Sequence, residues 1–307
     1  MNLPVCSRKG LCLFSILSKG FPEQQSSGRI ILYSSIGNSQ SDLNKGSKKL
    51  GKIIVFMNEK GGLGKTSLVF NACHVISGEK KKKRVLAIDM DAQMANLTYF
   101  TGTEKREDLP TMYNVLLQGG DIHDAIVTVK ERFDLIPATV NVANISSFAK
   151  VSRMRKVMDS IRDEYDYIII DVSPSPNHCH TLALAVSDYI LIPVNPDVTS
   201  LKANEGMMET IEEVRDSSNP RLKVLGILFN KNENRTNLGS KVRALTERFA
   251  ENLDTIVFDT KIRQNVALSE CVAAHMGITE YSPRSNGAKD ICAFVDEFVR
   301  RLEDDGR

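Results

Sequence analysis

The sequence has 307 residues, 42% hydrophobic and 25% charged, a composition typical of a globular protein with a sizeable core. Its six cysteines form no C-x-x-C pair, which argues against a zinc site, a cysteine-ligated cluster or a disulfide framework and favours a reducing cytoplasm. Residues 1–50 hold 7 Lys+Arg and 2 Asp+Glu, which leaves 33 Lys+Arg and 36 Asp+Glu for the remainder, a net charge of −3. Binding to nucleic acid would therefore need a local basic patch.

The first fifty residues differ from the rest, being rich in Ser, Gly and Lys. Their apolar cluster "LCLFSIL" at 11–17 follows Arg8 and Lys9, an order that faintly resembles a targeting peptide. No small-residue cleavage site follows it cleanly, so a loosely ordered extension or an upstream start codon is the favoured interpretation. We expect an extension and linker over 1–50 and one domain over 51–307, without an apolar run long enough for a membrane span.

Short apolar runs alternate with helical patterns from residue 52 onward. The runs are continuously apolar, without alternation of apolar and polar residues, and they are rich in β-branched side chains. This pattern is typical of strands buried on both faces of a parallel sheet. Segments between them, such as "TSLVFNACHVIS" and "MMETIEEVRD", have helical spacing. The pattern predicts an α/β fold, a doubly wound, mostly parallel sheet with helices on both faces. The predicted strands are 52–57, 84–90, 133–138, 165–171, 188–194, 222–230 and 255–259.

The stretch "NEKGGLGKTS" at 58–67 leaves the first strand and opens a helix. Gly64-Lys65-Thr66 satisfies the second half of the phosphate-binding pattern G-x-x-x-x-G-K-[ST], but Glu59 holds the place of its first glycine. A glycine-rich turn at a helix start presents backbone N–H groups to phosphate. We expect Lys65 to reach the β- and γ-phosphates, Thr66 to ligate Mg²⁺ and Ser67 to lie near the α-phosphate.

Carboxylates follow two other predicted strands. Asp171 ends "YDYIIID", where it could hold Mg²⁺ through the water shell of the ion. Asp89 and Asp91 lie in "AIDMDAQ", at the end of the strand after the first crossover helix. One of them could orient an attacking water. Taken alone, the pair would more often be a solvated turn with a helix cap.

The segments "KGGLGKTS", "IDMDAQMANLT" and "IIIDVSPSP" resemble the deviant Walker A, A-prime and Walker B motifs of the ParA/MinD superfamily of P-loop partition ATPases. Similarity to its ParA/Soj branch continues through "IPVNPDVTSLKANEGMMETIEEVR" and "EYSPRSNGAKD" and covers roughly residues 52–303. The resemblance implies a slow, Mg²⁺-dependent ATPase. It also implies a cytoplasmic, nucleoid-associated protein that segregates plasmids or chromosomes with a ParB-like centromere-binding partner and binds DNA without sequence preference.

The resemblance also implies roles for individual residues. Lys60 matches the signature lysine, which reaches the nucleotide of the other protomer in a sandwich homodimer. Asp91 matches the water-positioning aspartate, and Asp89 lies next to the metal. Asn230 occupies the place where relatives contact adenine, although an asparagine after a strand is also common turn chemistry. The implied nucleotide-binding residues are Lys60, Gly61, Gly62, Leu63, Gly64, Lys65, Thr66, Ser67 and Asn230.

The sequence departs from the family pattern in "KIRQNVALSE" at 261–270. Relatives that bind DNA usually read I-P-R-N-V-R-L-S-E, so Gln264 and Ala267 stand where two arginines are expected, and Arg263 could replace one of them. A basic patch remains a hypothesis, because residues 221–267 hold 9 Lys+Arg and 5 Asp+Glu. Its candidates are Lys231, Arg235, Lys241, Arg243, Arg248, Lys261 and Arg263. The alternative run "EKKKKR" at 79–84 is interpreted as a solvated turn.

Two other functions of the superfamily are less compatible with the sequence. A MinD-like positioning ATPase needs a basic amphipathic C-terminal helix on lipid, whereas this chain ends "RLEDDGR". The apolar stripe before that end is therefore expected to pack in the core: Ile291, Phe294, Val295, Phe298 and Leu302. A nitrogenase-reductase-like protein needs paired cysteines, and Cys179 has no convincing partner.

Overall fold

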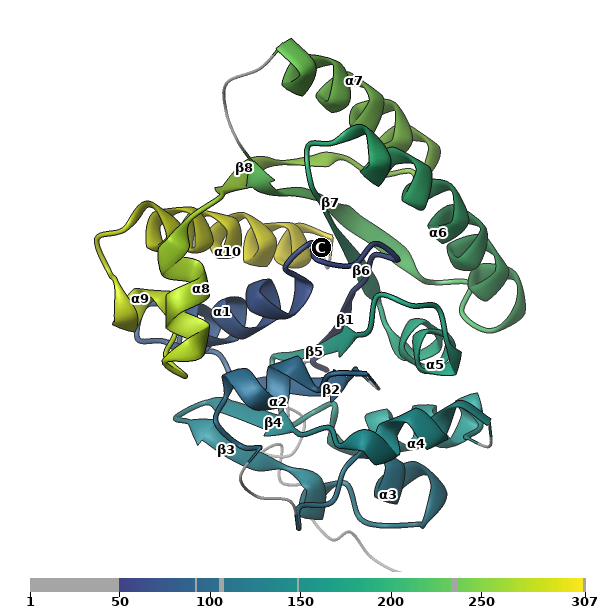
Figure 1. Cartoon of the computed structure of the whole chain (residues 1–307). Helices are drawn as coiled ribbons and strands as arrows, with labels where there is room; N and C mark the ends of the chain where they lie inside the picture. The colour runs from purple at the N-terminus through teal and green to yellow at the C-terminus, as the bar shows by residue number, and fades with distance from the viewer. Residues whose placement is uncertain (1–49, 92, 105–107, 148, 233–236, 306–307) are drawn as a thin grey trace, which may run out of the picture. The chain divides into compact units, whose positions relative to one another are not determined.

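A single mixed sheet organises the residues that the computed structural model describes, which are 50–91, 93–104, 108–147, 149–232 and 237–305. Its strand order is β3-β4-β2-β5-β1-β6-β7-β8 (Figure 1). Neighbouring strands run parallel except β3 and β4, which pair antiparallel at one edge. The strands are β1 Lys52–Phe56, β2 Val85–Met90, β3 Val127–Lys130, β4 Phe133–Ile136, β5 Tyr167–Val172, β6 Tyr189–Val194, β7 Lys223–Asn232 and β8 Val257–Arg263.

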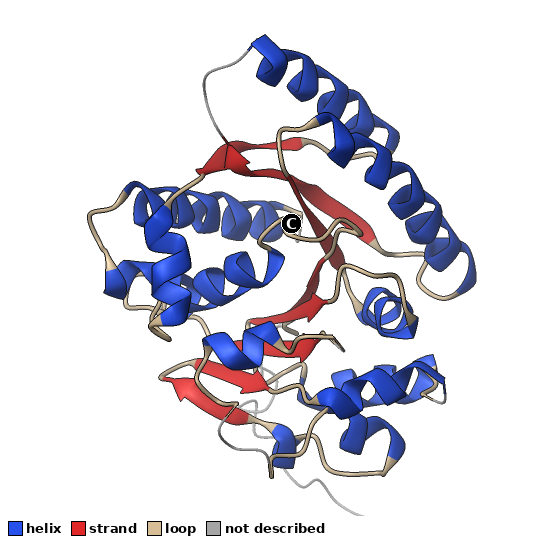
Figure 2. Cartoon of the chain, viewed as in Figure 1, coloured by secondary structure: helices blue, strands red, loops and turns tan. Residues whose placement is uncertain are grey.

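Helices cover both faces of this sheet (Figure 2). One apolar cluster joins the sheet to α3 Met112–Leu117, α4 Val151–Ile161, α5 His178–Val186, α6 Val198–Ser217 and α7 Asn237–Asn252. A second cluster joins the other face to α1 Lys65–Ser77, α2 Asn96–Phe100, α8 Val266–Ala273, α9 Ile278–Tyr281 and α10 Asn286–Asp304. Two 3₁₀ segments, η1 His123–Ala125 and η2 Val140–Ser147, complete the elements. The predicted doubly wound, mostly parallel fold is confirmed.

All seven predicted strands are present, and their central members are apolar on both faces as expected. Every residue of β2, β5 and β6 is buried. The strand that sequence reasoning missed is β3, in which Val127 is buried, Thr128 is exposed and the last two residues are partly exposed. An edge strand of four residues has one pairing partner and little apolar burial, so its sequence signal is weak.

The apolar stripe of α10 lies in the core. Ile291, Phe294, Val295, Phe298 and Leu302 are fully buried. The ring of Phe56 in β1 contacts the rings of Phe294 and Phe298 edge-on, at centroid distances of 6.4 and 5.9 Å. The expectation of core packing is therefore confirmed. Among the helices of the described residues, none combines the length and the apolar character that a bilayer span requires.

The chain divides into two units, residues 1–46 and 47–307. The elements above belong to the second unit. The predicted extension, with its apolar cluster at 11–17, lies outside the described residues apart from Leu50, and its role stays a prediction.

Candidate nucleotide-binding site

The predicted phosphate loop connects β1 to α1, at the carboxyl edge of the sheet. β1 ends at Phe56 and α1 begins at Lys65. Gly62 and Gly64 both have φ of 74°, a left-handed conformation that residues with a Cβ rarely adopt. At Gly64 a Cβ would also lie 2.8 Å from Nδ2 of Asn230. The sequence of this loop thus permits a tight turn whose backbone amides are close to any bound anion.

Lys65 is almost buried at the base of the loop, with 6% of its surface exposed. Its Nζ donates to the backbone carbonyl of Asn58 at 2.9 Å. Burial lowers the pKa of Lys65, and the carboxylates of Asp171 and Asp91 oppose this effect. An ammonium in such surroundings gains much from a phosphate, because charge interactions strengthen as water is excluded.

Asp171, at the end of β5, is fully buried, and neither oxygen of its carboxylate has a hydrogen-bond partner among the described residues. Burial and the charge of Asp89 raise the pKa of Asp171 well above its ordinary value, whereas the Thr66 hydroxyl and the Lys65 ammonium lower it. Mg²⁺ in nucleotide sites is held by one or two carboxylates together with phosphates and waters. A buried carboxylate beside the Thr66 hydroxyl is chemically suited to Mg²⁺, and the assignment of Asp171 and Thr66 to the metal stays a prediction.

Asp89 lies near the end of β2, beside Asp171 in the β2–β5 pair, and Asp91 directly follows the strand. Oδ2 of Asp89 accepts hydrogen bonds from the backbone N and the Oγ1 of Thr98 at 2.8 and 2.7 Å, and its Oδ1 accepts from the Asp91 N at 3.0 Å. Burial raises the pKa of Asp89 to about 6. Asp89 thus fixes the turn that carries Asp91, and its predicted place beside the metal stays a prediction.

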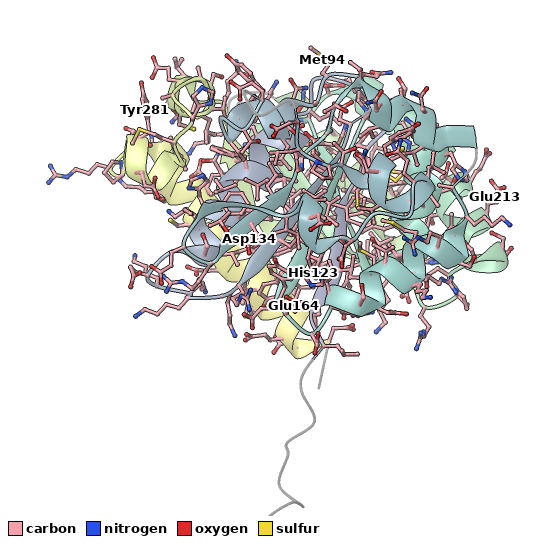
Figure 3. The ribbon with its side chains drawn as sticks, turned by 90° about the horizontal axis from the view of Figure 1, so that it is seen from below. Met94, His123, Asp134, Glu164, Glu213 and Tyr281 are labelled. Atoms are coloured by element: carbon pink, nitrogen blue, oxygen red, sulfur yellow. The ribbon has the colours of Figure 1, made fainter. Side chains whose placement is uncertain are left out.

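Asp91 is also tied into its own turn. Its Oδ1 accepts from the backbone N of Gln93 at 2.9 Å. Gln93 in turn donates through Nε2 to Oγ of Ser175 at 3.2 Å, which links this turn to the loop after β5. Met94 projects from the same turn and is 71% exposed (Figure 3). The turn therefore contacts the loop behind Asp171 on one side and presents an apolar side chain on the other.

Lys60 forms an ion pair within the chain. Its Nζ donates to both carboxylate oxygens of Asp197, at 2.7 and 2.8 Å. Asp197 lies directly before α6, and both side chains are partly exposed, 27% for Lys60 and 40% for Asp197. Pairs of this kind contribute about 0.2–1 kcal/mol to stability. The pair is therefore weak enough to be exchanged for a stronger anion.

A pocket of about 350 Å³ opens beside the phosphate loop. Asn230, at the end of β7, donates through Nδ2 to the carbonyl of Leu63 at 2.6 Å, and its neighbour Lys231 donates through Nζ to the carbonyl of Gly62 at 2.6 Å. The pocket is lined by Gly64, Ser67, Asn230, Lys231, Gln264 and Asn265 among others. The predicted base-contacting Asn230 thus lies at the pocket, and Gln264 lines it as well.

The predicted basic patch is partly neutralised. Arg263 donates through Nε and Nη2 to the two oxygens of Asp290, at 2.9 and 2.6 Å, and Nε of Arg243 donates to Glu247 at 2.8 Å. Lys231 is directed to the phosphate loop instead. Arg235 and the side chain of Lys241 lie outside the described part of the chain. The idea that Arg263 replaces a missing DNA-contacting arginine is weakened, because its guanidinium already forms a bidentate pair.

Sequence reasoning missed several residues that support the site. Asn58 is buried and joins the start of the loop to β6, since its Nδ2 donates to the carbonyl of Pro193 at 2.9 Å and its Oδ1 accepts from the Lys60 N at 2.9 Å. Thr98 connects Asp89 to the Ala138 N, which donates to its Oγ1 at 2.8 Å. An asparagine three residues before the first glycine of such a turn is a turn-forming signal that could have identified Asn58.

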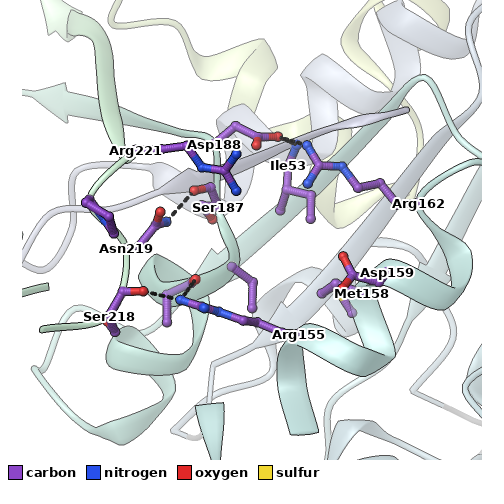
Figure 4. A pocket seen from close by; sticks show the side chains of 13 residues that line it. Ile53, Arg155, Met158, Asp159, Arg162, Ser187, Asp188, Ser218, Asn219 and Arg221 are labelled. Carbon is purple, nitrogen blue, oxygen red and sulfur yellow. Dashed lines mark hydrogen bonds and ion pairs between the residues drawn. The ribbon is translucent and has the colours of Figure 1, made fainter. Parts of the chain in front are cut away.

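A second pocket of about 430 Å³ lies at the amino ends of the strands, away from the phosphate loop (Figure 4). Two of the three arginines that line it, Arg155 and Arg162, are engaged by the protein itself. Arg155 donates to the carbonyls of Ala185 and Ser218 at helix ends, and Arg162 pairs with Asp188 at 2.5 Å. Ligands of open α/β sheets bind at the carboxyl ends of the strands, so the pocket beside the loop is the better candidate site.

Comparison with known proteins agrees with this geometry. A sequence model for a family described as "AAA domain" matches residues 51–224. The sporulation initiation inhibitor protein Soj of Bacillus subtilis is 34% identical, over 78% of this chain and 95% of that protein. The chromosome-partitioning ATPase Soj of Thermus thermophilus is 32% identical, over 82% of this chain and 96% of its own.

The fold also matches the crystal structure of the cell division ATPase MinD of Pyrococcus furiosus. The TM-score is 0.67 at 23% identity, and the match covers 82% of this chain and all of that one. Together with a phosphate loop that carries Lys60 and Lys65, these similarities show that the chain belongs to the ParA/MinD family of P-loop ATPases.

Proposed function

We propose that this protein is an ATPase that forms a homodimer around Mg-ATP and uses it to partition DNA, together with a ParB-like centromere-binding partner. The observation that carries the proposal is the arrangement of the phosphate loop. It places the buried Lys65 and the exchangeable Lys60 on one turn, beside the unpaired carboxylate of Asp171. Similarity to Soj proteins supports the partition role.

Each residue of the site has a separate role in the transfer of a phosphoryl group to water. The amides of Gly61 to Gly64 and the start of α1 bind the phosphates, and Lys65 neutralises their charge. Asp171 and Thr66 would hold Mg²⁺, which when bound offsets the negative charge of the triphosphate. Asp91 orients the attacking water from a turn that Asp89 fixes through the Thr98 and Asp91 amides. Such a reaction depends on positioning and charge neutralisation, without a covalent intermediate.

Lys60 is proposed to change partner when the dimer forms. In the single chain it contacts Asp197, and in the dimer it contacts the phosphates held by the other protomer. An ammonium about 4 Å from a phosphate oxygen gains roughly 1 kcal/mol per unit charge in water and roughly 4 kcal/mol at an effective dielectric of 20. The exchange therefore becomes favourable when the two protomers exclude water from the nucleotide.

Two lysine variants test this proposal. Lys65→Ala is expected to weaken ATP binding by at least about tenfold, because a buried cation at the phosphates is lost. Lys60→Ala is expected to bind ATP nearly normally but to stay monomeric with a non-hydrolysable ATP analogue. Nucleotide affinity is measured by calorimetry and mass in solution by light scattering.

Asp197→Asn serves as the matched variant, because it removes the carboxylate charge that Lys60 contacts and leaves the lysine in place. Each protomer gives up one such pair of about 0.2–1 kcal/mol, so the variant should tighten the nucleotide-dependent dimer by about 2- to 30-fold. A wild-type chain that stays monomeric with the bound analogue, or does not bind it, would refute the proposal. A Lys60→Ala variant that dimerises as well as wild type would refute the exchange alone.

Retention on nonspecific DNA at two salt concentrations, alongside anionic liposomes, separates partition from a MinD-like positioning role. DNA binding through phosphates is lost at high salt. The proposed location is accordingly cytoplasmic and nucleoid-associated. The burial of the α10 stripe favours partition, since those apolar side chains already pack on the sheet. ATP-independent retention on DNA, or binding to liposomes alone, would contradict the partition role.

A further inference from the structure

We infer that Lys231 is a nucleotide-contacting residue, whose ammonium braces the phosphate loop and whose methylene stem forms a wall of the base pocket. This inference rests on the proposed binding of ATP. The Nζ of Lys231 donates to the carbonyl of Gly62 at 2.6 Å, across 169 positions of the sequence. A Cβ on Gly64 would lie 3.8 Å from the Cε of Lys231. The stem therefore passes over the loop at the two glycines that shape it.

Lys231 shares the pocket with residues that fix where a nucleoside would leave the loop. Ser67, on the first turn of α1, lines the same pocket as Lys231 and Asn230. Phosphates bound along the loop toward the start of α1 would bring the nucleoside to this opening. One side of the pocket is then the aliphatic stem of Lys231, whose charged end is directed to the Gly62 carbonyl.

The backbone at Lys231 is left-handed, as it is at Lys82, but of these two lysines it is Lys231 whose ammonium contacts the phosphate loop. Its φ of 50° is left-handed, a conformation that is unfavourable for a residue with a Cβ. Asn230, its neighbour, is held at the same time by the carbonyl of Leu63. Glycine would relieve the strain but would lose the stem and the ammonium. A strained lysine that contacts the phosphate loop is better explained by ligand binding than by a DNA-binding patch.

Three variants and two probes test the inference. Lys231→Gly removes stem and charge while it relieves the backbone, and Lys231→Met removes the charge but keeps most of the stem. Lys82→Gly is the matched control, because Lys82 is also left-handed, with φ of 52°, in the turn between α1 and β2. Each variant is titrated by calorimetry with Mg-ATP and with Mg-tripolyphosphate, which has no base. Unfolding by urea without nucleotide shows whether the variants are folded.

For ATP we expect Lys231→Met to bind about fivefold more tightly than Lys231→Gly, a difference of about 1 kcal/mol at 1.4 kcal/mol per tenfold change. For tripolyphosphate the two variants should bind equally, because only the base contacts the stem. Lys231→Gly should be at least as stable as wild type, and Lys82→Gly should bind both probes as wild type does.

Other outcomes overturn the inference. Equal affinities of the Met and Gly variants for ATP, or the same difference with both probes, would show that the stem does not contact the base. Wild-type affinity for ATP in Lys231→Gly, with reduced retention on DNA, would return Lys231 to the basic patch. A wild-type chain that binds tripolyphosphate and ATP equally poorly would refute the proposed function itself. This result differs from those that refute only the role of Lys231, so the two failures can be told apart.

Discussion

Asp171 lies in surroundings that are unfavourable to its own charge. Its carboxylate is buried with no hydrogen-bond partner in the part of the chain that the structure describes, and burial raises its pKa well above the ordinary value. We predict that Asp171→Asn stabilises the nucleotide-free protein by roughly 1–2 kcal/mol, because a buried charge costs more than a buried amide. The same change should abolish Mg²⁺-dependent ATP hydrolysis. Urea unfolding and phosphate release measure the two effects.

The control for this prediction is Asp159→Asn, an exposed aspartate of α4 near the opposite edge of the sheet. It should change stability by less than about 0.5 kcal/mol and leave hydrolysis unchanged. A destabilised Asp171→Asn protein would mean that the carboxylate has a partner that offsets its burial. The prediction would then be wrong for stability, whatever the effect on hydrolysis.

At this scale the sequence predicted which residues meet when they lie on one motif or at the ends of neighbouring strands. Lys65, Thr66 and Asp171 come together because parallel strands bring their carboxyl ends to one edge. The contacts of Lys231 with Gly62 and of Arg263 with Asp290 join residues from unrelated segments. The spacing of residues in the sequence contains no information about contacts between distant segments. The sequence analysis therefore names Lys231 and Arg263 as candidates for the basic patch.

At the scale of elements, His74 connects α1 to its neighbours. Its ring packs edge-on against Phe70 of α1 and Phe133 of β4, at 4.5 and 5.4 Å, and its Nδ1 lies 3.6 Å from Oε1 of Glu280 in α9. Burial and the charge of Lys130 lower the pKa of His74 to about 4, although Glu280 opposes them. The packing of these elements therefore requires a neutral imidazole.

A histidine with a lowered pKa in the folded state contributes stability that is complete above its unfolded pKa of about 6.5 and is lost as the pH falls toward 4. By pH 5 the loss should reach about 2 kcal/mol. We predict that His74→Phe, whose ring does not titrate, loses about 2 kcal/mol less than wild type between pH 7.5 and pH 5. Urea unfolding of the nucleotide-free protein at the two pH values measures this difference. Equal losses in both proteins would show that His74 is protonated without cost.

Most helices and strands were predictable from the sequence, because the central strands are apolar on both faces. β3 lacks this property and was missed. β5 and β6 are continuous apolar runs, because both faces of a central parallel strand are covered by helices. β3 pairs with β4 alone and is partly exposed, so its four residues lack that signature. The antiparallel pairing of β3 with β4 could not be predicted from the sequence, because β3 itself gave no strand signal.

At the scale of the whole molecule, charge is distributed unevenly around a body whose net charge is −3 over residues 51–307. Arg243 and Arg263 of the predicted basic patch are paired with Glu247 and Asp290. Arg248 on α7 is exposed and Lys261 on β8 is partly exposed, so these two remain the described candidates for contact with DNA phosphates. A patch with few cations implies weak retention and a shallow dependence on salt.

We predict that the double change Arg248→Glu with Lys261→Glu weakens ATP-dependent retention on nonspecific DNA at least about tenfold at low salt. Each phosphate contact that is lost should reduce the slope of log affinity against log salt by about 0.9. The control is Lys80→Glu with Lys82→Glu, in the run 79–84, which alters net charge equally but lies in the turn between α1 and β2, at the amino ends of the strands. Filter binding across a salt series measures both, and ATP affinity should be unchanged in each. If the control pair loses retention instead, DNA binds at the amino edge of the sheet, and the run 79–84 is more than a solvated turn.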